Sequence, residues 1–219
     1  MYKAVLFDLD GTLLDTLEDL ADSMNAALSG LGFPLHPVSS YKDFVGEGVE
    51  FLAYSALPEK NRNEATLAEC IKRMRQEYGL RWDHKTKPYS GIPELLTELE
   101  KRGIRKAILS NKPDDFTKKV AGKFLKDWSF ETVLGSQTNF PKKPDPVAAL
   151  SIAESMKFQP MEFLYLGDTK IDMLTAVAAG MFPVGALWGF RSRQELAESG
   201  GKKLIQKPQE LLEFFHHAQ

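Results

Sequence analysis

Hydrophobic residues follow different patterns in successive parts of the chain. Residues 4–7 are four consecutive apolar residues directly before Asp8, which is typical of a fully buried strand of a parallel sheet. Between residues 17 and 85 apolar residues recur at helical spacing, without a convincing strand pattern. From residue 86 onward, short apolar runs alternate with helical periods. The pattern therefore predicts an α/β fold interrupted by a helical insertion.

The helical insertion is predicted to contain three helical regions. Thr16 and Asp19 have the spacing of a capping box, and the apolar residues after them predict a helix over residues 17–31. A second helical region breaks at Gly46-Glu47-Gly48. A third helix is expected between residues 61 and 80, where one face would carry Leu67, Cys70, Ile71, Met74 and Tyr78.

The second half of the chain alternates strands with helices of about ten residues, which predicts a doubly wound, Rossmann-like parallel sheet with helices on both faces. The expected strands are residues 104–109, 133–134, 163–166 and 182–187. The expected helices are residues 92–99, 146–156 and 172–179, with a terminal helix at 211–215. Residues 1–16 and 86–219 would then form an α/β core domain, and residues 17–85 an all-helical cap domain.

Composition excludes several classes of protein. With 43% hydrophobic residues, 26% charged residues and a net charge of −2, the chain is neither disordered nor a nucleic-acid coating. Cys70 is the single cysteine, so the chain cannot form an internal disulfide. We expect its thiol to be buried and the protein to occupy a reducing compartment. The apolar runs at residues 4–7 and 176–190 are too short for a signal peptide and a membrane span. We expect a cytoplasmic protein without nucleic-acid or membrane partners, its oligomeric state left open.

Two acids follow the first predicted strand. Strand alternation sends the side chains of Asp8 and Asp10 the same way, and Gly11 allows the chain to turn away. Like charges this close destabilise each other unless a cation, a proton or a positive partner intervenes. The pair therefore predicts Mg²⁺ binding or proton transfer, with a polar turn of helix-capping acids as the alternative.

Later strand ends carry further polar groups. Ser110 and Asn111 could hydrogen-bond phosphate oxygens, or Ser110 could simply cap a helix. Lys143 precedes a rigid turn, where its ammonium could neutralise a carboxylate and a phosphate, although lysines before prolines are also common on surfaces. Asp168 ends another strand, with Asp172 four residues later. Asp168 could supply a ligand to Mg²⁺ or cap the next helix.

Taken together, these stretches resemble the ordered motifs of phosphatases of the haloacid dehalogenase superfamily. The run D-L-D-G-T-L-L-D-T at residues 8–16 resembles the family's opening motif. The strand-end S-N-K, the K-P-D-P stretch and G-D-x-x-x-D follow in the family's order, over nearly the whole chain. The helical insertion is similar to the family's C1-type cap, and phosphoglycolate phosphatase-like members are the most similar.

The resemblance implies an Mg²⁺-dependent enzyme that hydrolyses small-molecule phosphate monoesters. It implies that Asp8 is the nucleophile that forms an aspartyl phosphate and is also a metal ligand. Asp10 would be the general acid and base, and a ligand through its backbone carbonyl. The remaining roles would be phosphate binding or orientation by Ser110, Asn111, Lys143 and Thr12, and support of the metal by Asp168 and Asp172.

Three alternatives remain open within this family. A β-phosphoglucomutase-like phosphomutase shares the core and the second aspartate, but such mutases typically present arginine near the glycine turn, where this chain has residues 44–50 without one. A dehalogenase would need neither Asp10 nor Mg²⁺. A silent interaction module would not need all these chemical groups. Within the phosphatase reading, Glu47 and Glu50 would disfavour small dianionic substrates such as phosphoglycolate if they faced the site, or would simply be exposed.

Overall fold

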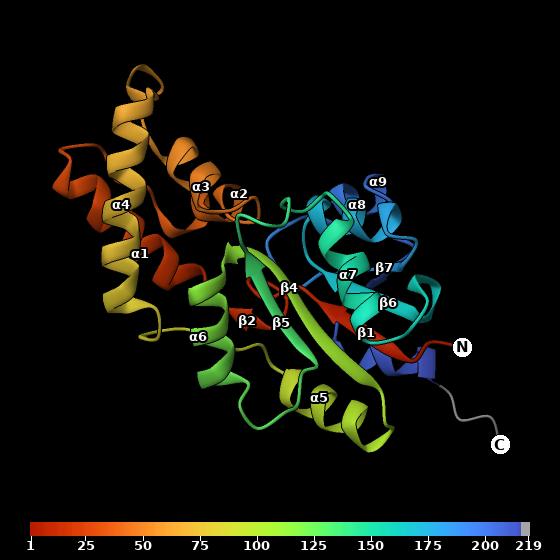
Figure 1. Cartoon of the computed structure of the whole chain (residues 1–219). Helices are drawn as coiled ribbons and strands as arrows, with labels where there is room; N and C mark the ends of the chain where they lie inside the picture. The colour runs from red at the N-terminus through yellow and green to blue at the C-terminus, as the bar shows by residue number, and fades with distance from the viewer. Residues whose placement is uncertain (216–219) are drawn as a thin grey trace.

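The structure, a computed structural model that describes residues 1–215, is built around a six-stranded sheet (Figure 1). The strand order is β5-β4-β1-β6-β7-β8, and every neighbouring pair runs parallel. The doubly wound parallel sheet predicted from the sequence is therefore confirmed. Its strands are β1 (Ala4–Phe7), β4 (Arg105–Pro113), β5 (Thr132–Ser136), β6 (Phe163–Gly167), β7 (Phe182–Ala186) and β8 (Lys203–Ile205).

Helices cover both faces of this sheet because side chains alternate along its strands. Val5 and Phe7 of β1 belong to the hydrophobic cluster on one face, and Ala4 and Leu6 to the cluster on the other. The first cluster contains side chains of α5 (Ile92–Lys101), α6 (Asp114–Phe124) and the 3₁₀ helix η4 (Pro208–Phe215). The second contains side chains of α7 (Val147–Ser155) and α8 (Lys170–Ala178), and α9 (Arg193–Glu198) contacts α8.

Residues 17–85, here called the helical segment, contain helices and no strand. Their apolar side chains form a third cluster, which Phe116 and Phe190 of the α/β part also join. Cys70 is fully buried in it as predicted, and burial raises the pKa of its thiol to about 11. The division into a core and a cap domain at residues 16 and 86 stays a prediction. The segment comprises α1 (Leu17–Gly30), η1 (Val38–Ser40), α2 (Tyr41–Phe44), α3 (Val49–Ala56), η2 (Glu59–Asn61) and α4 (Glu64–Arg81).

The chain enters and leaves the helical segment through two short paired strands. β2 (Leu14–Asp15) runs antiparallel to β3 (Lys87–Pro88). The capping box predicted at Thr16 and Asp19 is wrong, since within residues 1–215 the buried Thr16 hydroxyl has no hydrogen-bond partner. Asp19 instead accepts hydrogen bonds from the backbone N–H groups of residues 85 and 86, at 2.8 to 3.0 Å. This carboxylate therefore fastens the returning chain to α1.

Two further predictions were wrong in part. β4 continues to Pro113 because its pairing with β5 reaches Ser136, so Ser110 lies inside a strand and is not a helix N-cap. The terminal helix forms, but as the 3₁₀ helix η4. The sequence pattern also missed β8, which has three residues and is only partly buried.

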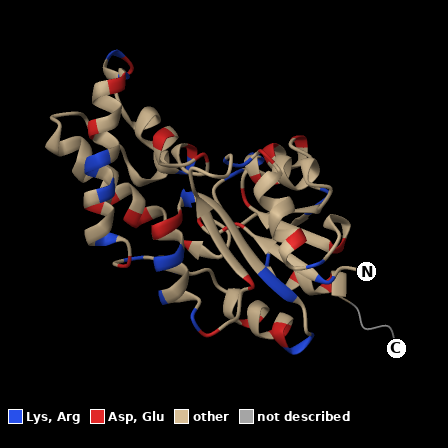
Figure 2. Cartoon of the chain, in the orientation of Figure 1, with Lys and Arg blue, Asp and Glu red and all other residues tan. Residues whose placement is uncertain are grey.

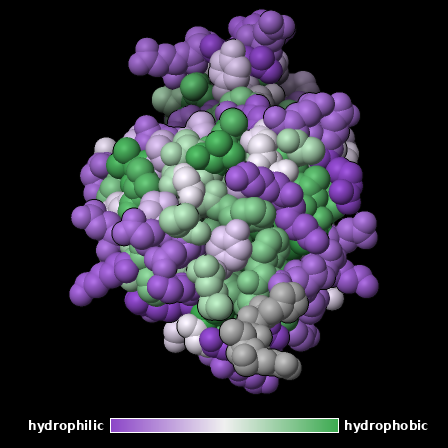
Figure 3. All heavy atoms as spheres, turned by 90° about the vertical axis from the view of Figure 1, so that its right-hand side faces the viewer, coloured by the Kyte–Doolittle hydropathy of each residue, from purple (hydrophilic) through white to green (hydrophobic). Residues whose placement is uncertain are grey.

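Charged residues of both signs are interspersed over the helical segment and the α/β part (Figure 2). The face shown in Figure 3 presents hydrophobic side chains among hydrophilic ones. Among residues 1–215, none of the helices combines the length and hydropathy that a transmembrane span requires. The exposed large apolar residues of α7 and α8 are Val147, Leu150, Leu174 and Val177.

Candidate active site

Three buried carboxylates meet at the carboxyl ends of β1 and β6. Asp8 directly follows β1, Asp168 follows β6, and Asp172 lies in the first turn of α8. One oxygen of each carboxylate lies within 4.8 Å of the other two. Carboxylate oxygens are the protein ligands that Mg²⁺ prefers, and Mg²⁺ typically keeps several of its waters. The donor set of this carboxylate cluster therefore fits a divalent cation.

Two glycines allow the acids to approach one another. Gly11 has a φ of +84°, and a Cβ there would lie 2.3 Å from Oδ2 of Asp168. A Cβ at Gly167 would lie 2.3 Å from Cβ of Asp172. Real Cβ atoms do not come this close to other heavy atoms, so a larger residue at either position would displace an acid of the carboxylate cluster.

Hydrogen bonds fix the orientation of Asp168. The Thr12 hydroxyl donates to its Oδ1 at 2.8 Å, and the N–H of Phe190 donates to its Oδ2 at 2.8 Å. Thr12 is fully buried and does not line the pocket, which favours the orienting role over phosphate binding, the two roles that the resemblance implied for it. The alternative interpretation of Asp168 as a helix cap is wrong, because Thr169 caps α8 and Asp172 completes that capping box.

Lys143 lies inside the carboxylate cluster, with its side chain only 2% exposed, so the surface alternative is wrong for this lysine. Its Nζ lies 2.9 Å from Oδ1 of Asp8, 2.6 Å from Oδ1 of Asp172 and 3.1 Å from the carbonyl oxygen of Leu109. These contacts use all three donors of an ammonium. Burial lowers the pKa of Lys143, but the charges of Asp172 and Asp8 outweigh it and raise the pKa well above its usual value.

One lysine does not neutralise three acids. Burial and the charge of Asp172 raise the pKa of Asp8 to about 7, against the opposing effect of Lys143. Burial, Asp172 and Asp8 also raise the pKa of Asp168 well above its usual value. Burial among like charges therefore disfavours the ionised forms of Asp8 and Asp168, and an added positive charge would favour them. This excess negative charge is a second reason why a cation fits the site.

Asp10 lies on the same side of the chain as Asp8, as predicted, since both side chains line one pocket. Nζ of Lys112 lies 3.0 Å from each carboxylate oxygen of Asp10 and 4.6 Å from the ring centroid of Tyr78. Lys112 was not predicted as a site residue. Ser110, Asn111 and Lys112 all line the pocket and the pairing of β4 is irregular between Leu109 and Pro113, so strand alternation does not identify this lysine. Its position directly after the apolar run of β4 was the available signal.

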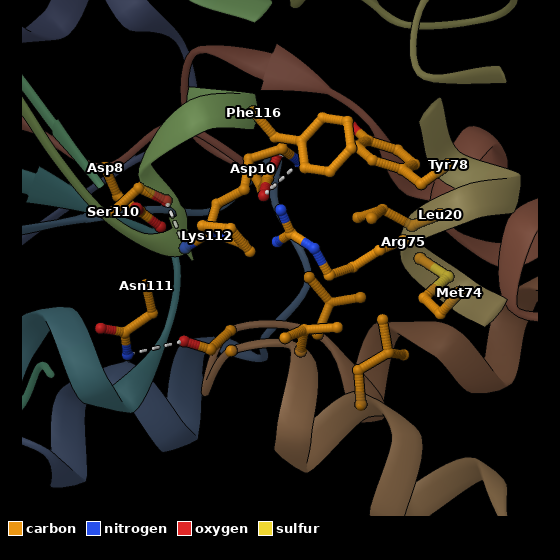
Figure 4. A pocket seen from close by; sticks show the side chains of 16 residues that line it. Asp8, Asp10, Leu20, Met74, Arg75, Tyr78, Ser110, Asn111, Lys112 and Phe116 are labelled. Carbon is orange, nitrogen blue, oxygen red and sulfur yellow. Dashed lines mark hydrogen bonds and ion pairs between the residues drawn. The ribbon is translucent and has the colours of Figure 1, made fainter. Parts of the chain in front are cut away.

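The pocket encloses about 600 Å³, solvent at its mouth included, between the acids and the helical segment (Figure 4). Its polar wall comes from the α/β part and comprises Asp8, Asp10, Ser110, Asn111 and Lys112. The helical segment supplies a mostly apolar wall that includes Leu20, Val45, Val49, Leu52 and Met74. Arg75 and Tyr78 of α4 also line the pocket and were not predicted as site residues.

Asn111 joins three parts of the chain at the edge of this pocket. Its Nδ2 donates to the carbonyl oxygen of Gly46 at 3.2 Å and to that of Lys143 at 3.1 Å. Its Oδ1 accepts from the N–H of Lys143 at 2.9 Å. The amide therefore holds the lysine loop and the glycine turn of the helical segment together.

Glu47 and Glu50 do not line the pocket. Glu50 forms an ion pair with Lys142, and Oε1 of Glu47 lies 3.4 Å from Nζ of Lys170. Both lysines belong to the α/β part, so each glutamate faces a neutralising charge. In this arrangement the two glutamates are therefore paired with lysines and lie outside the pocket lining.

Comparisons with known proteins agree with this geometry. The sequence profile of the haloacid dehalogenase-like hydrolase family matches residues 5–186. A phosphoglycolate phosphatase of Vibrio parahaemolyticus is 31% identical over 216 residues, which cover 96% of this chain and 95% of the relative. A phosphoglycolate phosphatase of Aquifex aeolicus is 32% identical over 188 residues, with 86% of each chain covered. The crystal structure of a predicted phosphoglycolate phosphatase from Haemophilus somnus superposes with a TM-score of 0.90 at 25% identity, covering 98% of both chains.

Proposed function

Since the chain belongs to the haloacid dehalogenase-like hydrolase family and is a phosphoric monoester hydrolase, we propose that it hydrolyses small-molecule phosphate monoesters with Mg²⁺ through an aspartyl phosphate. Phosphoglycolate is the substrate that its relatives support best. The single observation that carries the proposal is the buried carboxylate cluster of Asp8, Asp168 and Asp172, of which Asp8 also lines the pocket.

Asp8 is the proposed nucleophile. Its carboxylate attacks phosphorus while the bond from phosphorus to the leaving oxygen breaks, and Asp10 donates a proton to that oxygen. Lys143 reduces the repulsion between the Asp8 carboxylate and the phosphate dianion. Mg²⁺ bound by Asp8, Asp168 and Asp172 would neutralise further negative charge.

Asp10 then acts in the opposite direction. It takes a proton from water, the water oxygen attacks phosphorus, and the bond from phosphorus to Asp8 breaks. The hydroxyl of Ser110 lines the same pocket and is proposed to bind the phosphate. Both donors of the Asn111 amide are already used, so Asn111 is proposed to orient the lysine loop at the edge of the pocket. Water attack in place of a second acceptor hydroxyl is what distinguishes this hydrolase from a phosphomutase.

The test uses purified protein and p-nitrophenyl phosphate. Release of inorganic phosphate should require Mg²⁺, stop in EDTA and be lost in Asp8→Asn. In Asp10→Asn the first displacement should survive, because p-nitrophenolate leaves without a proton, whereas hydrolysis of the intermediate should slow by about 10²- to 10⁴-fold. A rapid burst of p-nitrophenol followed by slow release should result. Labelled borohydride should reduce the accumulated aspartyl phosphate and place its label on Asp8.

An alkyl phosphate provides the matched control for this experiment. Its alkoxide needs a proton to leave, so Asp10→Asn should give no burst with it. Equal losses and no burst with both esters would contradict the acid and base role of Asp10. Full turnover without metal would contradict the proposed Mg²⁺ site.

A further inference from the structure

Arg75 is the exception in the wall that the helical segment presents to the pocket. It lies on α4 beside the apolar Met74, and Figure 4 shows its guanidinium directed across the pocket toward the side that carries Lys112. Its guanidinium carbon lies 5.3 Å from the ring centroid of Phe116. A partly exposed positive charge at the edge of an otherwise apolar wall can meet an anion that enters the pocket.

The present partner of Arg75 is a weak one. Nη2 of Arg75 lies 2.7 Å from Oδ2 of Asp115, which is on α6 outside the pocket lining. The side chains are 42% and 60% exposed, and ion pairs this exposed contribute little to stability. An anion inside the pocket, less exposed to water, can therefore compete with Asp115 for the guanidinium.

Lys112 is not available to bind an anion on the leaving group. Within residues 1–215, Arg75 and Lys112 are the two cations that line the pocket. The side chain of Lys112 is 3% exposed and its ammonium bonds both oxygens of Asp10. Arg75 thus remains the cation that can meet a charge on the leaving group.

We propose that Arg75 determines substrate specificity by binding a carboxylate on the leaving group, in exchange for its contact with Asp115. This inference rests on the proposed function, and it assigns to Arg75 the recognition of the carboxylate that phosphoglycolate and similar phosphate esters of short hydroxy acids carry. The phosphate lies against Asp8 and Ser110, the short carbon chain lies along the apolar wall, and the carboxylate meets the planar guanidinium, whose paired donors match it.

The test compares two esters that differ only in this charge. Phosphoglycolate carries a carboxylate where ethyl phosphate carries a methyl group, so the ratio of their kcat/KM values reports carboxylate recognition. In Arg75→Gln this ratio should fall by about 10- to 100-fold, the usual effect of losing a charged hydrogen bond. Arg75→Lys should fall between Arg75→Gln and wild type, since it keeps the charge and loses the planar fork.

Arg73 supplies a matched control. It lies on the same helix, is 40% exposed and is paired with Glu69 at 2.8 Å, but it does not line the pocket. Arg73→Gln should leave the ratio at its wild-type value. Asp115→Asn should act in the opposite direction to Arg75→Gln and raise the ratio by about two- to fivefold, because it removes the competing carboxylate. In the Arg75→Gln background the same change should have no effect.

The outcomes separate the inference from the proposed function. If wild type hydrolyses both esters with Mg²⁺ and neither Arg75→Gln nor Asp115→Asn changes the ratio, the inference is overturned and the proposed function stands. If Arg73→Gln lowers the ratio as much as Arg75→Gln does, recognition by Arg75 is likewise overturned. A wild type that hydrolyses p-nitrophenyl phosphate but neither of these two esters would overturn the inference and leave the proposed function standing. A wild type that hydrolyses no phosphate ester would overturn both.

Discussion

Asp8 is a carboxyl group whose ionisation the fold opposes. Its pKa of about 7 in the folded chain lies above the value of about 3.9 for an exposed aspartate. Between these two values the folded state binds more protons than the unfolded state. The contribution of Asp8 to stability is therefore fully present below about pH 4 and is lost as the pH rises through 7.

We expect this loss to be measurable without metal. In EDTA, the free energy of unfolding of wild type minus that of Asp8→Asn should fall by up to about 1.4 kcal/mol per pH unit between about pH 4 and 7. Urea unfolding across this range provides the measurement, and Mg²⁺ should restore wild-type stability at the upper end because it binds the folded state. A difference that stays constant with pH would show that the Asp8 carboxyl is not buried against its neighbours.

The sequence allowed some of the pocket residues to be predicted and not others. Asp8, Ser110 and Asp168 follow apolar strand runs, and the carboxyl ends of parallel strands share one edge of the sheet. Arg75 reaches the pocket only because α4 packs across it, and helical periodicity places it on the polar side of its helix. Contacts that depend on how two separate parts pack leave no periodic signal in the chain.

At the scale of elements, the end of β6 and the start of α8 must fit closely. In Gly167→Ala the new methyl group would meet Asp172, so we expect weaker Mg²⁺ binding and a loss of kcat/KM of about 10-fold or more. Titration calorimetry and the p-nitrophenyl phosphate assay would measure these effects.

Gly79→Ala is the control for this change. Gly79 lies inside α4, and among residues 1–215 no heavy atom beyond its own helix backbone and chain neighbours would lie within 4 Å of an added Cβ. Alanine there should therefore stabilise the chain by about 0.5–1 kcal/mol. Unchanged metal binding in Gly167→Ala would contradict the close fit between β6 and α8.

Fully buried elements were the ones that sequence patterns predicted best. β1 and β6 are continuous apolar runs because both of their faces are covered. β4 extends past its apolar run through Ser110, Asn111 and Lys112, which are buried by their role in the pocket and not by hydrophobicity. For η4, the spacing of Leu211, Leu212 and Phe215 indicates one buried face but does not distinguish a 3₁₀ from an α-helix.

At the scale of the whole molecule, one arginine connects the two parts beside the pocket. Nη2 of Arg191 donates to the carbonyl oxygens of Val45 at 2.9 Å and Asp43 at 3.3 Å, and its other terminal nitrogen donates to that of Lys42. Arg191→Ala should therefore loosen α3 and the loop between α2 and α3, which contains Val45. Amide hydrogen exchange over residues 45–52 should rise by about tenfold or more.

Exchange in β1 and β6 should change little in the same variant, since these strands lie in the interior of the sheet. Arg193→Ala, which removes an exposed arginine two residues away, is the matched control and should leave exchange over residues 45–52 unchanged. Equal exchange in both variants would mean that Arg191 does not hold the loop.

The pairing of β2 with β3 also bears on how such a molecule can diversify. The residues on either side of the helical segment, Asp15 and Lys87, are already partners in an antiparallel ladder, like the two arms of a hairpin. The helical segment therefore occupies the position of a long hairpin loop between β2 and β3. We expect insertions, deletions or exchange of helices there to leave the register of β1 and β6 unchanged, because neither strand belongs to this ladder. The helical segment can thus vary in evolution while the strands that carry the acids stay the same.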